Sequence, residues 1–441
     1  MAVTTTAAAQ SPHSPHHTNH RAMAMVTTLF FTWGFCTVLN DAVIPHLQSI
    51  FDLSYAQAAL IQLAFFGSYF VFALPAGKLV EWVGYQRTMV IGLLMMCAGA
   101  LLFIPSAIAA TYAFFLAAEV VLAAGVTVLQ VAANPYVTIL GPAETASSRL
   151  NLTQAFNTLG DSVAPYVGGV LILGGATAAA LSGTQLQGAA LTAYRVHEAA
   201  SIKLPFYAIA AATAVLALAI AFYRFPRIAI TREFRPANLQ GKQEHVWSHP
   251  HLYLGAIGIF VYVGAEVSIG SFLVKYFADP QIAGLPLEKG AKLVTFYWAG
   301  MMVGRFIGSA AMQRLAANWM LAWSGAGAAL LVLASLLGTG HFAVGAILAV
   351  GLFNSIMFPT IFTLAIAELG PLTGRGSGLL VQAIVGGAVF PVLMGFLADR
   401  YGIHHSLLMP LLCYLYVIYY GWKGYRIQPS EPQVHLEAVE E

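Results

Sequence analysis

The chain has 441 residues, of which 59% are hydrophobic and 9% are charged, and its mean hydropathy is +0.75. Water-soluble domains average about 25% charged residues, so most of this surface faces a medium other than water. The net charge of +2 and the lack of a basic stripe exclude nucleic acid as a partner. The three cysteines stand far apart in apolar runs, without metal-ligand spacing. No cofactor or metal is therefore expected.

Apolar runs long enough to cross a bilayer recur along the whole sequence. A hydrocarbon core of about 30 Å needs about 20 helical residues, and the alternating pattern of a membrane barrel is missing. The predicted spans are 23–45, 57–80, 88–107, 112–140, 150–175, 203–224, 251–277, 290–313, 319–338, 341–369, 375–398 and 404–426. The sequence therefore predicts an all-α membrane protein with twelve transmembrane helices.

The second half of the chain repeats the first at a separation of about 226 residues. The paired positions are Gly77 and Gly304, Lys78 and Arg305, Arg149 and Arg375, and Asp41 and Glu266. A duplicated apolar chain with paired polar interruptions is typical of carriers that hold their substrate between two halves. We therefore expect two pseudo-symmetric six-helix bundles.

Five segments follow from this pattern. They are a disordered N-terminal tail (1–22), a first bundle (23–224), a linker (225–250), a second bundle (251–426) and a C-terminal tail (427–441). The first tail holds several histidines that could bind a metal, but its polar composition favours an unstructured segment.

The basic residues predict how the chain is oriented in the membrane. With the N-terminus in the cytoplasm, every Lys and Arg lies on the cytoplasmic side except Arg195, Lys203, Lys275, Lys289, Lys292 and Arg400. Membrane proteins concentrate Lys and Arg in their cytoplasmic loops, so both termini are expected there.

Three helices of the first half carry polar stripes at helical spacing. The stripes contain Trp33, Asn40 and Asp41 in 23–45, Gln130 and Asn134 in 112–140, and Gln154, Asn157 and Asp161 in 150–175. We expect Asn134-Pro135 to interrupt its helix and to free backbone carbonyls that only a lined cavity tolerates. Because amides both donate and accept hydrogen bonds, such a cavity suits a neutral polyhydroxy ligand. Polar contacts between helices are the alternative explanation.

The second half contributes four further candidates, Glu266, Trp298, Asn354 and Gln382. Aromatic rings among amides would let a sugar stack its C–H face while its hydroxyls find partners. An ionisable side chain at the bilayer centre costs about 2.5–3.5 kcal/mol on insertion scales, so such residues usually face the bundle interior. We therefore expect these side chains to face the same cavity.

Several motifs give the chain a family resemblance. The loop GKLVEWVGYQR at 77–87 resembles the signature of the major facilitator superfamily, with glutamate where aspartate is usual. The runs ND at 40–41, AANPYVT at 132–138 and RLNLTQAFN at 149–157 resemble the fucose–galactose–glucose:proton symporters of that superfamily. GAEVS at 264–268 resembles the glucose/galactose branch. The likeness extends over most of the chain.

The resemblance implies uptake of a hexose with a coupled proton by alternating access. It implies that Asp41 carries the proton, that Gln154 and Asn157 contact the sugar and that Trp33 lies near the cavity. It also implies a hinge-like cytoplasmic gate. The gate candidates, from the loop signature and its repeat, are Gly77, Lys78, Glu81, Gly84, Arg87, Arg149, Gly304, Arg305, Arg314 and Arg375.

Two positions depart from the family pattern. Fucose carriers have a glutamate where this chain has Gln130, and Glu266 could replace that missing acid as a second proton-coupling residue. Asp161 stands where the family has an uncharged residue. Both differences bear on how many acids take part in coupling.

Several other functions fit the same residues. Sodium coupling is the nearest alternative, because carboxylates and carbonyls also bind hard cations. Uptake of fucose or N-acetylglucosamine, export of a small molecule, and sensing without transport are further possibilities. An enzyme is disfavoured, since no nucleophile–base pair occurs in the spans. We expect a multi-pass protein of a bacterial inner membrane that works as a monomer, with a small neutral sugar, a cation and the lipid bilayer as its partners.

Overall fold

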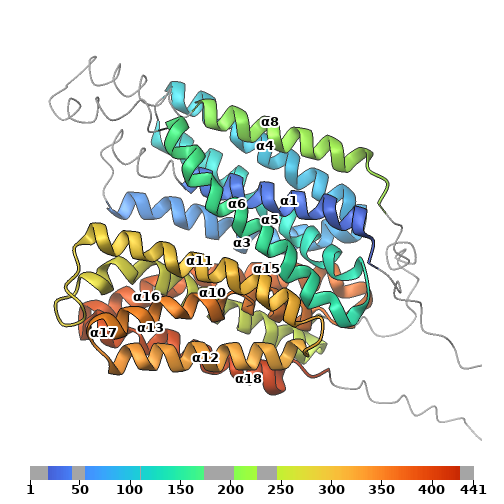
Figure 1. Cartoon of the computed structure of the whole chain (residues 1–441). Coiled ribbons are helices and arrows are strands. Elements are labelled where there is room, and N and C mark those ends of the chain that lie inside the picture. The colour runs from blue at the N-terminus through green and yellow to red at the C-terminus, as the bar shows by residue number, and fades with distance from the viewer. Residues whose placement is uncertain (1–17, 42–54, 110, 173–202, 226–245, 428–441) are drawn as a thin grey trace, which may run out of the picture.

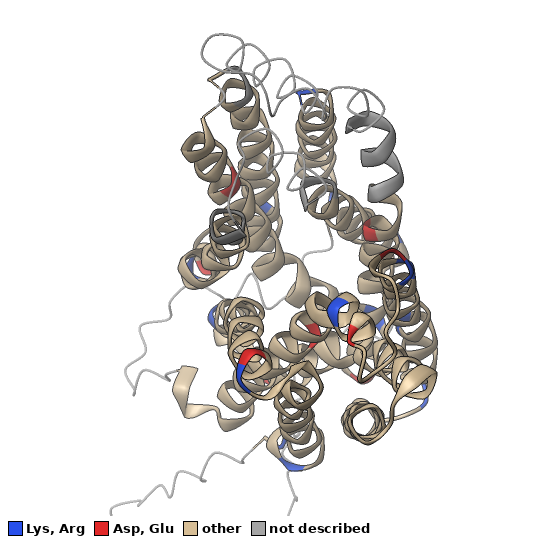
Figure 2. Cartoon of the chain, turned by 90° about the vertical axis from the view of Figure 1, so that its left-hand side faces the viewer, with Lys and Arg blue, Asp and Glu red and all other residues tan. Residues whose placement is uncertain are grey.

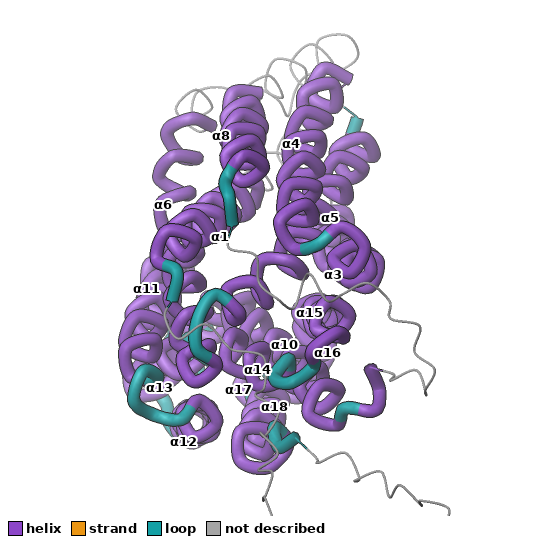
Figure 3. Tube along the Cα trace, turned by 90° about the vertical axis from the view of Figure 1, so that its right-hand side faces the viewer, coloured by secondary structure: helices purple, strands orange, loops and turns teal. Residues whose placement is uncertain are grey.

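The computed structural model describes residues 18–41, 55–109, 111–172, 203–225 and 246–427 (Figure 1). All regular structure in these ranges is helical, and the described connections are short (Figure 3). The expected linker 225–250 and both expected tails lie mostly outside the described residues.

The first half contains six long helices. They are α1 (His20–Asp41), α3 (Tyr55–Val83), α4 (Tyr85–Ala109), α5 (Tyr112–Ile139), α6 (Ala146–Ile172) and α8 (Lys203–Phe222). Each covers one predicted span, with its ends within a few residues of the prediction. The short 3-10 turn η1 (Ala143–Thr145) precedes α6.

The second half also contains six spans, three of them broken into shorter helices. They are α10 (Pro250–Ala278), α11 (Leu287–Ala311), α12 (Ala317–Leu337), α13 with α14 (Gly340–Asn354, Met357–Ala365), α15 with α16 (Thr373–Gln382, Gly386–Tyr401), and α17 with α18 (Ile403–Ser406, Leu408–Tyr419). The turn η6 (Ala383–Val385) joins α15 to α16. The predicted fold of twelve helical spans is confirmed.

The first helix begins three residues earlier than expected. The backbone N–H of Ala22 donates to Oδ1 of Asn19 at 3.0 Å, so Asn19 caps a helix that starts at His20. An asparagine before the first turn satisfies a backbone N–H that has no partner within the helix. Hydropathy alone does not detect this cap, because Asn19 and His20 are polar.

Apolar side chains cover the outside of the bundle. Phe222 is 82% exposed and Leu337 is 78% exposed, which would be costly in water but suits lipid. Ten of the spans are apolar and long enough to cross a membrane by composition alone. The spans α6 and α11 fall short because they carry polar side chains, and these two helices pack against each other across the halves.

Figure 1 shows the first half of the chain above the second. Figure 2, which views many of the helices nearly end-on, shows few charged residues along them. Because successive spans run antiparallel, α1 and α10 begin at the same end of the bundle, where α3, α5 and α14 finish. We call this end the termini end.

Helix α5 runs without a break through Pro135, so the expected interruption there is wrong. Proline has no N–H, which leaves the carbonyl of Val131, four residues earlier, without its helical donor. The hydroxyl of Ser377 in α15 donates to this carbonyl at 2.8 Å. A side chain of the other half thus replaces the lost hydrogen bond, and the helix continues.

Arg149 closes the same helix at its last turn. Its guanidinium donates to the carbonyls of Val137 at 3.2 Å, Thr138 at 2.5 Å and Pro142 at 2.8 Å. These carbonyls lie at or just beyond the end of α5, where the backbone supplies only long bonds, to Val137 from Leu140 at 3.4 Å and to Pro142 from Thr145 at 3.3 Å. Arg149 is 6% exposed, so solvent does not replace these bonds.

We therefore expect Arg149→Ala to lower stability by about 1.5–3 kcal/mol, the usual range for hydrogen bonds from a charged donor. Arg149→Lys should restore little, because one ammonium group cannot serve carbonyls in several directions. Thermal unfolding of the purified protein in detergent measures both. The exposed Arg87→Ala is the control, and an equal loss of stability there would contradict this role for Arg149.

Candidate functional site

The predicted amides of α5 and α6 meet inside the first half. Gln130, Asn134 and Gln154 are all less than 5% exposed. Gln130 donates its Nε2 to the hydroxyl of Tyr69 at 2.5 Å, and Gln154 donates its Nε2 to Oδ1 of Asn134 at 3.5 Å. The Nδ2 group of Asn134 is buried without a partner among the described residues. The sequence did not single out Tyr69, because one tyrosine among many carries no signal of its own.

Helix α1 joins this cluster through its backbone. Asn157 donates its Nδ2 to the carbonyl of Phe30 at 2.9 Å. A Cβ on Gly34 would lie 2.7 Å from Oδ1 of Asp161, so this carboxylate faces α1 where the helix has no side chain. Trp33 is 6% exposed, and its ring lies 5.3 Å from that of Phe30.

Asp41 is the last residue of α1. The side chains of Asn40 and Asp41 lie outside the described part of the structure, so their roles stay predictions.

The second half holds its own buried polar cluster. Asn354 is fully buried and donates its Nδ2 to the hydroxyl of Tyr297 at 2.8 Å, while Tyr262 donates to the carbonyl of Asn354 at 2.8 Å. Glu266 is half-buried one turn after Tyr262, near enough to Arg305 for their opposite charges to attract. The repeat predicted Glu266, but it gave no indication of Tyr297.

Of the remaining two candidates, Trp298 lies at the edge of this cluster and Gln382 lies on α15 against α3. Trp298 is 43% exposed, packs its ring edge against Tyr297 at 5.2 Å and lies beside Gly270 of α10. Gln382 is half-buried at the end of α15 and donates its Nε2 to the carbonyl of Phe70 in α3 at 2.9 Å. Its amide thus bridges the two halves.

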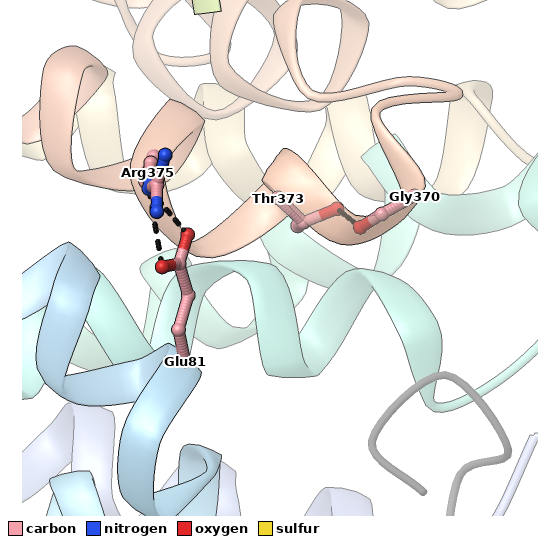
Figure 4. A network of polar contacts seen from close by, with 4 residues as sticks. All are labelled: Glu81, Gly370, Thr373 and Arg375. Atoms are coloured by element: carbon pink, nitrogen blue, oxygen red, sulfur yellow. Dashed lines mark hydrogen bonds and ion pairs between the residues drawn. The ribbon is translucent and has the colours of Figure 1, made fainter. Parts of the chain in front are cut away.

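Two rows of contacts join the halves toward the termini end. The first, which we call the α3–α15 seam, contains an ion pair in which Nε of Arg375 lies 2.8 Å and 3.1 Å from the two carboxylate oxygens of Glu81 (Figure 4). Next to the pair, a Cβ on Gly77 would lie 2.7 Å from the carbonyl of Gly374. Small residues on both helices let their backbones approach this closely.

The second row, which we call the α6–α11 seam, is built from hydroxyl groups and Arg305 and includes Thr363 of α14. The hydroxyls of Ser147 and Thr363 lie 2.5 Å apart, and Ser148 donates to the carbonyl of Ser309 at 2.7 Å. Arg305 donates to the carbonyl of Gln154 at 2.9 Å.

The same guanidinium also bonds the hydroxyl of Thr158 and donates its Nε to the carbonyl of Ser355 at 3.2 Å. The loop signature predicted Arg305 as a gate residue, and the structure places it inside the seam.

The other gate candidates lie in turns and on surfaces. Gly84 has a φ of +83°, a conformation that favours glycine, in the turn between α3 and α4. A Cβ on Gly304 would lie 2.5 Å from the carbonyl of Leu352, so this glycine lets α11 approach α13. Lys78, Arg87 and Arg314 are exposed.

An apolar groove of about 580 Å³ lies between α3, α10 and α15. Its lining includes Phe70, Tyr253, Phe260, Leu379 and the candidate Gln382. A sugar site needs several polar groups, and this mostly apolar groove contains only one of the candidate side chains. Among the described residues, no group of three or more His, Cys, Asp and Glu could hold a metal ion.

Comparison with known proteins agrees with this architecture. The family model of the Major Facilitator Superfamily matches residues 22–384. A glucose/galactose transporter of Brucella abortus is 51% identical over 403 residues, covering 91% of this chain and 94% of the relative. The L-fucose-proton symporter of Escherichia coli is 33% identical and covers 90% of this chain and 92% of the relative.

A solved structure supports the same assignment. The crystal structure of the transporter FucP in the outward conformation superimposes with a TM-score of 0.84 at 33% identity, over 91% of this chain and 98% of that one. The chain therefore belongs to the major facilitator superfamily, in the family that includes the glucose/galactose transporters and the fucose–proton symporters.

Proposed function

We propose that this protein takes up a hexose of the glucose/galactose type together with a proton by alternating access. This proposal rests mainly on one observation: each half buries its own polar cluster, of amides in the first half and of Asn354 with two tyrosines in the second, while two seams close the halves together at one end. A substrate held between the clusters could leave only at the opposite end until the seams open. The identity to a glucose/galactose transporter supports the choice of sugar.

The closed end is the cytoplasmic end in this proposal. Arg21, Arg149, Arg375 and Lys423 all lie on helix turns near the termini end, and membrane proteins concentrate basic residues on the cytoplasmic side. Both termini then lie in the cytoplasm of a bacterial cell with the protein in its inner membrane. The conformation described here then opens outward, as FucP does in its named outward conformation.

The binding site in this proposal combines Trp33, Asn40, Gln130, Asn134, Gln154, Asn157, Asp161, Trp298, Asn354 and Gln382. Amides suit hydroxyl groups because both kinds of group donate and accept hydrogen bonds. Among the described residues, Nδ2 of Asn134 and Oδ1 of Asn354 make no hydrogen bond, and they are one donor and one acceptor of this kind. An exporter of lipophilic cations would instead need a larger apolar pocket.

Asp41 and Glu266 would carry the coupling proton. A carboxylate that takes up a proton loses its charge, so it can enter apolar surroundings at much lower cost. Proton uptake from outside would therefore favour occlusion, and rehydration on the cytoplasmic side would favour release. One chain supplies both clusters and both seams, which supports a functional monomer.

We expect Asp41→Asn to separate transport from coupling. In proteoliposomes, sugar counterflow should persist because the amide keeps the carrier neutral at that position, whereas accumulation driven by a pH gradient should disappear. Glu266→Gln is tested in the same way, and loss of accumulation there would make it the second coupling acid. Unchanged accumulation in Asp41→Asn would refute the role of Asp41.

The coupling ion and the sugar need separate measurements. Uptake driven by a sodium gradient at constant pH is compared with uptake driven by a pH gradient without sodium. The proposal expects only the pH gradient to drive accumulation. Competition of unlabelled galactose, fucose, mannose and N-acetylglucosamine against labelled glucose then identifies the substrate, with glucose and galactose expected to compete best.

The ion pair Glu81–Arg375 yields a further prediction. The Arg375 side chain is 50% exposed, so solvent screens the pair and its contribution should not exceed about 1 kcal/mol. Arg375→Glu should therefore change initial uptake by up to about fivefold. The double variant Glu81→Arg/Arg375→Glu should restore it. If the double variant is as impaired as the single one, the attraction between these two side chains is not what matters.

A further inference from the structure

Two prolines in the membrane-spanning helices sit at matching places of the two halves, and each leaves a backbone carbonyl without its helical donor. Pro135 in α5 deprives the carbonyl of Val131, and Pro359 in α14 deprives that of Ser355. In a bilayer no water is at hand for such a carbonyl, so a protein donor has to replace the lost N–H.

The two halves solve this problem differently. The carbonyl of Ser355 receives Nε of Arg305, which belongs to the same half, so that bond does not depend on how the halves are arranged. The carbonyl of Val131 receives the hydroxyl of Ser377, which belongs to the opposite half. Parting the halves therefore breaks the second bond, whereas the first can persist.

The surroundings fix this contact tightly. Ser377 and Val131 are both fully buried. The neighbouring Gly378 approaches α3 so closely that a Cβ would lie 2.7 Å from the carbonyl of Ala73. The Ser377 hydroxyl is therefore held against α5 by close backbone packing.

We propose that Ser377 is a positioning residue that holds the α3–α15 seam closed by supplying the donor that Pro135 removes. When this seam opens, no backbone N–H of α5 can replace the Ser377 hydroxyl, so the Val131 carbonyl stays without a donor until water reaches it. A hydroxyl pair such as Ser147 and Thr363 differs, because each of these groups can turn to another partner. The proposal rests on alternating opening of the halves, but its test needs neither sugar nor proton.

The test measures how often the seam opens. Val80 is 5% exposed and lies 3.3 Å from the position of a Cβ on Gly374, so a cysteine there is covered while the seam is closed. Val80→Cys is made in a chain whose natural cysteines Cys36, Cys97 and Cys413 are replaced by alanine. The rate of labelling by a maleimide is measured on purified protein in detergent micelles, where both faces are accessible.

We expect Ser377→Ala to raise the labelling rate by roughly threefold to tenfold, the equivalent of one net hydrogen bond. Ser377→Thr should keep the parent rate because it keeps the hydroxyl. Ser106→Ala is the matched control, since Ser106 is equally buried but bonds a carbonyl of its own helix, that of Phe103 at 2.7 Å. Thermal unfolding of each variant verifies that it is folded.

A double-mutant cycle with Pro135→Ala makes the proposal specific. Alanine restores the N–H at position 135, so Val131 regains its helical partner and Ser377→Ala should then have little further effect. An unchanged rate in Ser377→Ala would overturn the proposal. So would an increase of equal size in the Pro135→Ala background, or an increase in Ser106→Ala. Because the readout is seam opening, a carrier with another substrate or ion would still give the expected result.

Discussion

The constraint that governs this structure is that a backbone carbonyl inside a bilayer must find its donor within the protein. Regular helices meet this demand with their own N–H groups. Carbonyls at helix ends and four residues before a proline lack such a donor, and side chains supply it there. Arg149 covers the last carbonyls of α5, Arg305 covers Ser355, and Ser377 covers Val131. Asn157 and Gln382 also donate to carbonyls of neighbouring helices, and there they add a bond between helices inside regular helical segments. Some polar side chains of this membrane protein thus replace missing backbone donors, while others join one helix to the next.

Hydropathy and duplication predicted most of the fold. Span lengths follow from bilayer thickness, so helices such as α8 and α12 could be located to within a few residues. The start of α1 was missed because the Asn19 cap is a hydrogen bond and not an apolar pattern. The continuity of α5 through Pro135 was missed because the compensating donor lies more than two hundred residues away in the sequence.

The candidate site was predictable in composition but not in pairing. Helical spacing identified the polar face of α5 that carries Gln130 and the polar face of α6 that carries Gln154 and Asn157, because periodicity is local. It could not identify Tyr69 as the partner of Gln130, or Tyr297 as the partner of Asn354. The rotation of one helix against another, which sets these pairs, is determined by tertiary packing. The sequence did indicate that a donor is needed, because Pro135 within an apolar span leaves the Val131 carbonyl without its helical N–H. It did not indicate that Ser377 supplies that donor.

The two seams differ in chemistry although they occupy equivalent places in the repeat. The α3–α15 seam relies on glycines and the pair Glu81–Arg375, so its closure depends on close backbone approach. The α6–α11 seam relies on hydroxyls and a guanidinium that reaches backbone carbonyls. The repeat therefore preserves where the halves meet, while the residues that hold them together are free to diverge.

The hydroxyl pairs of the α6–α11 seam have a thermodynamic consequence. A serine or threonine that loses its protein partner can bond incoming water almost as well, so the enthalpy of the wetted seam differs little from that of the dry one. Two arrangements separated by a few kcal/mol are both populated, and a ligand shifts such a balance only by its difference in affinity between them. Because these contacts are weak and exchangeable, a modest difference in binding free energy is enough to shift the carrier between its two arrangements. A row of buried ion pairs would instead hold it in one of them.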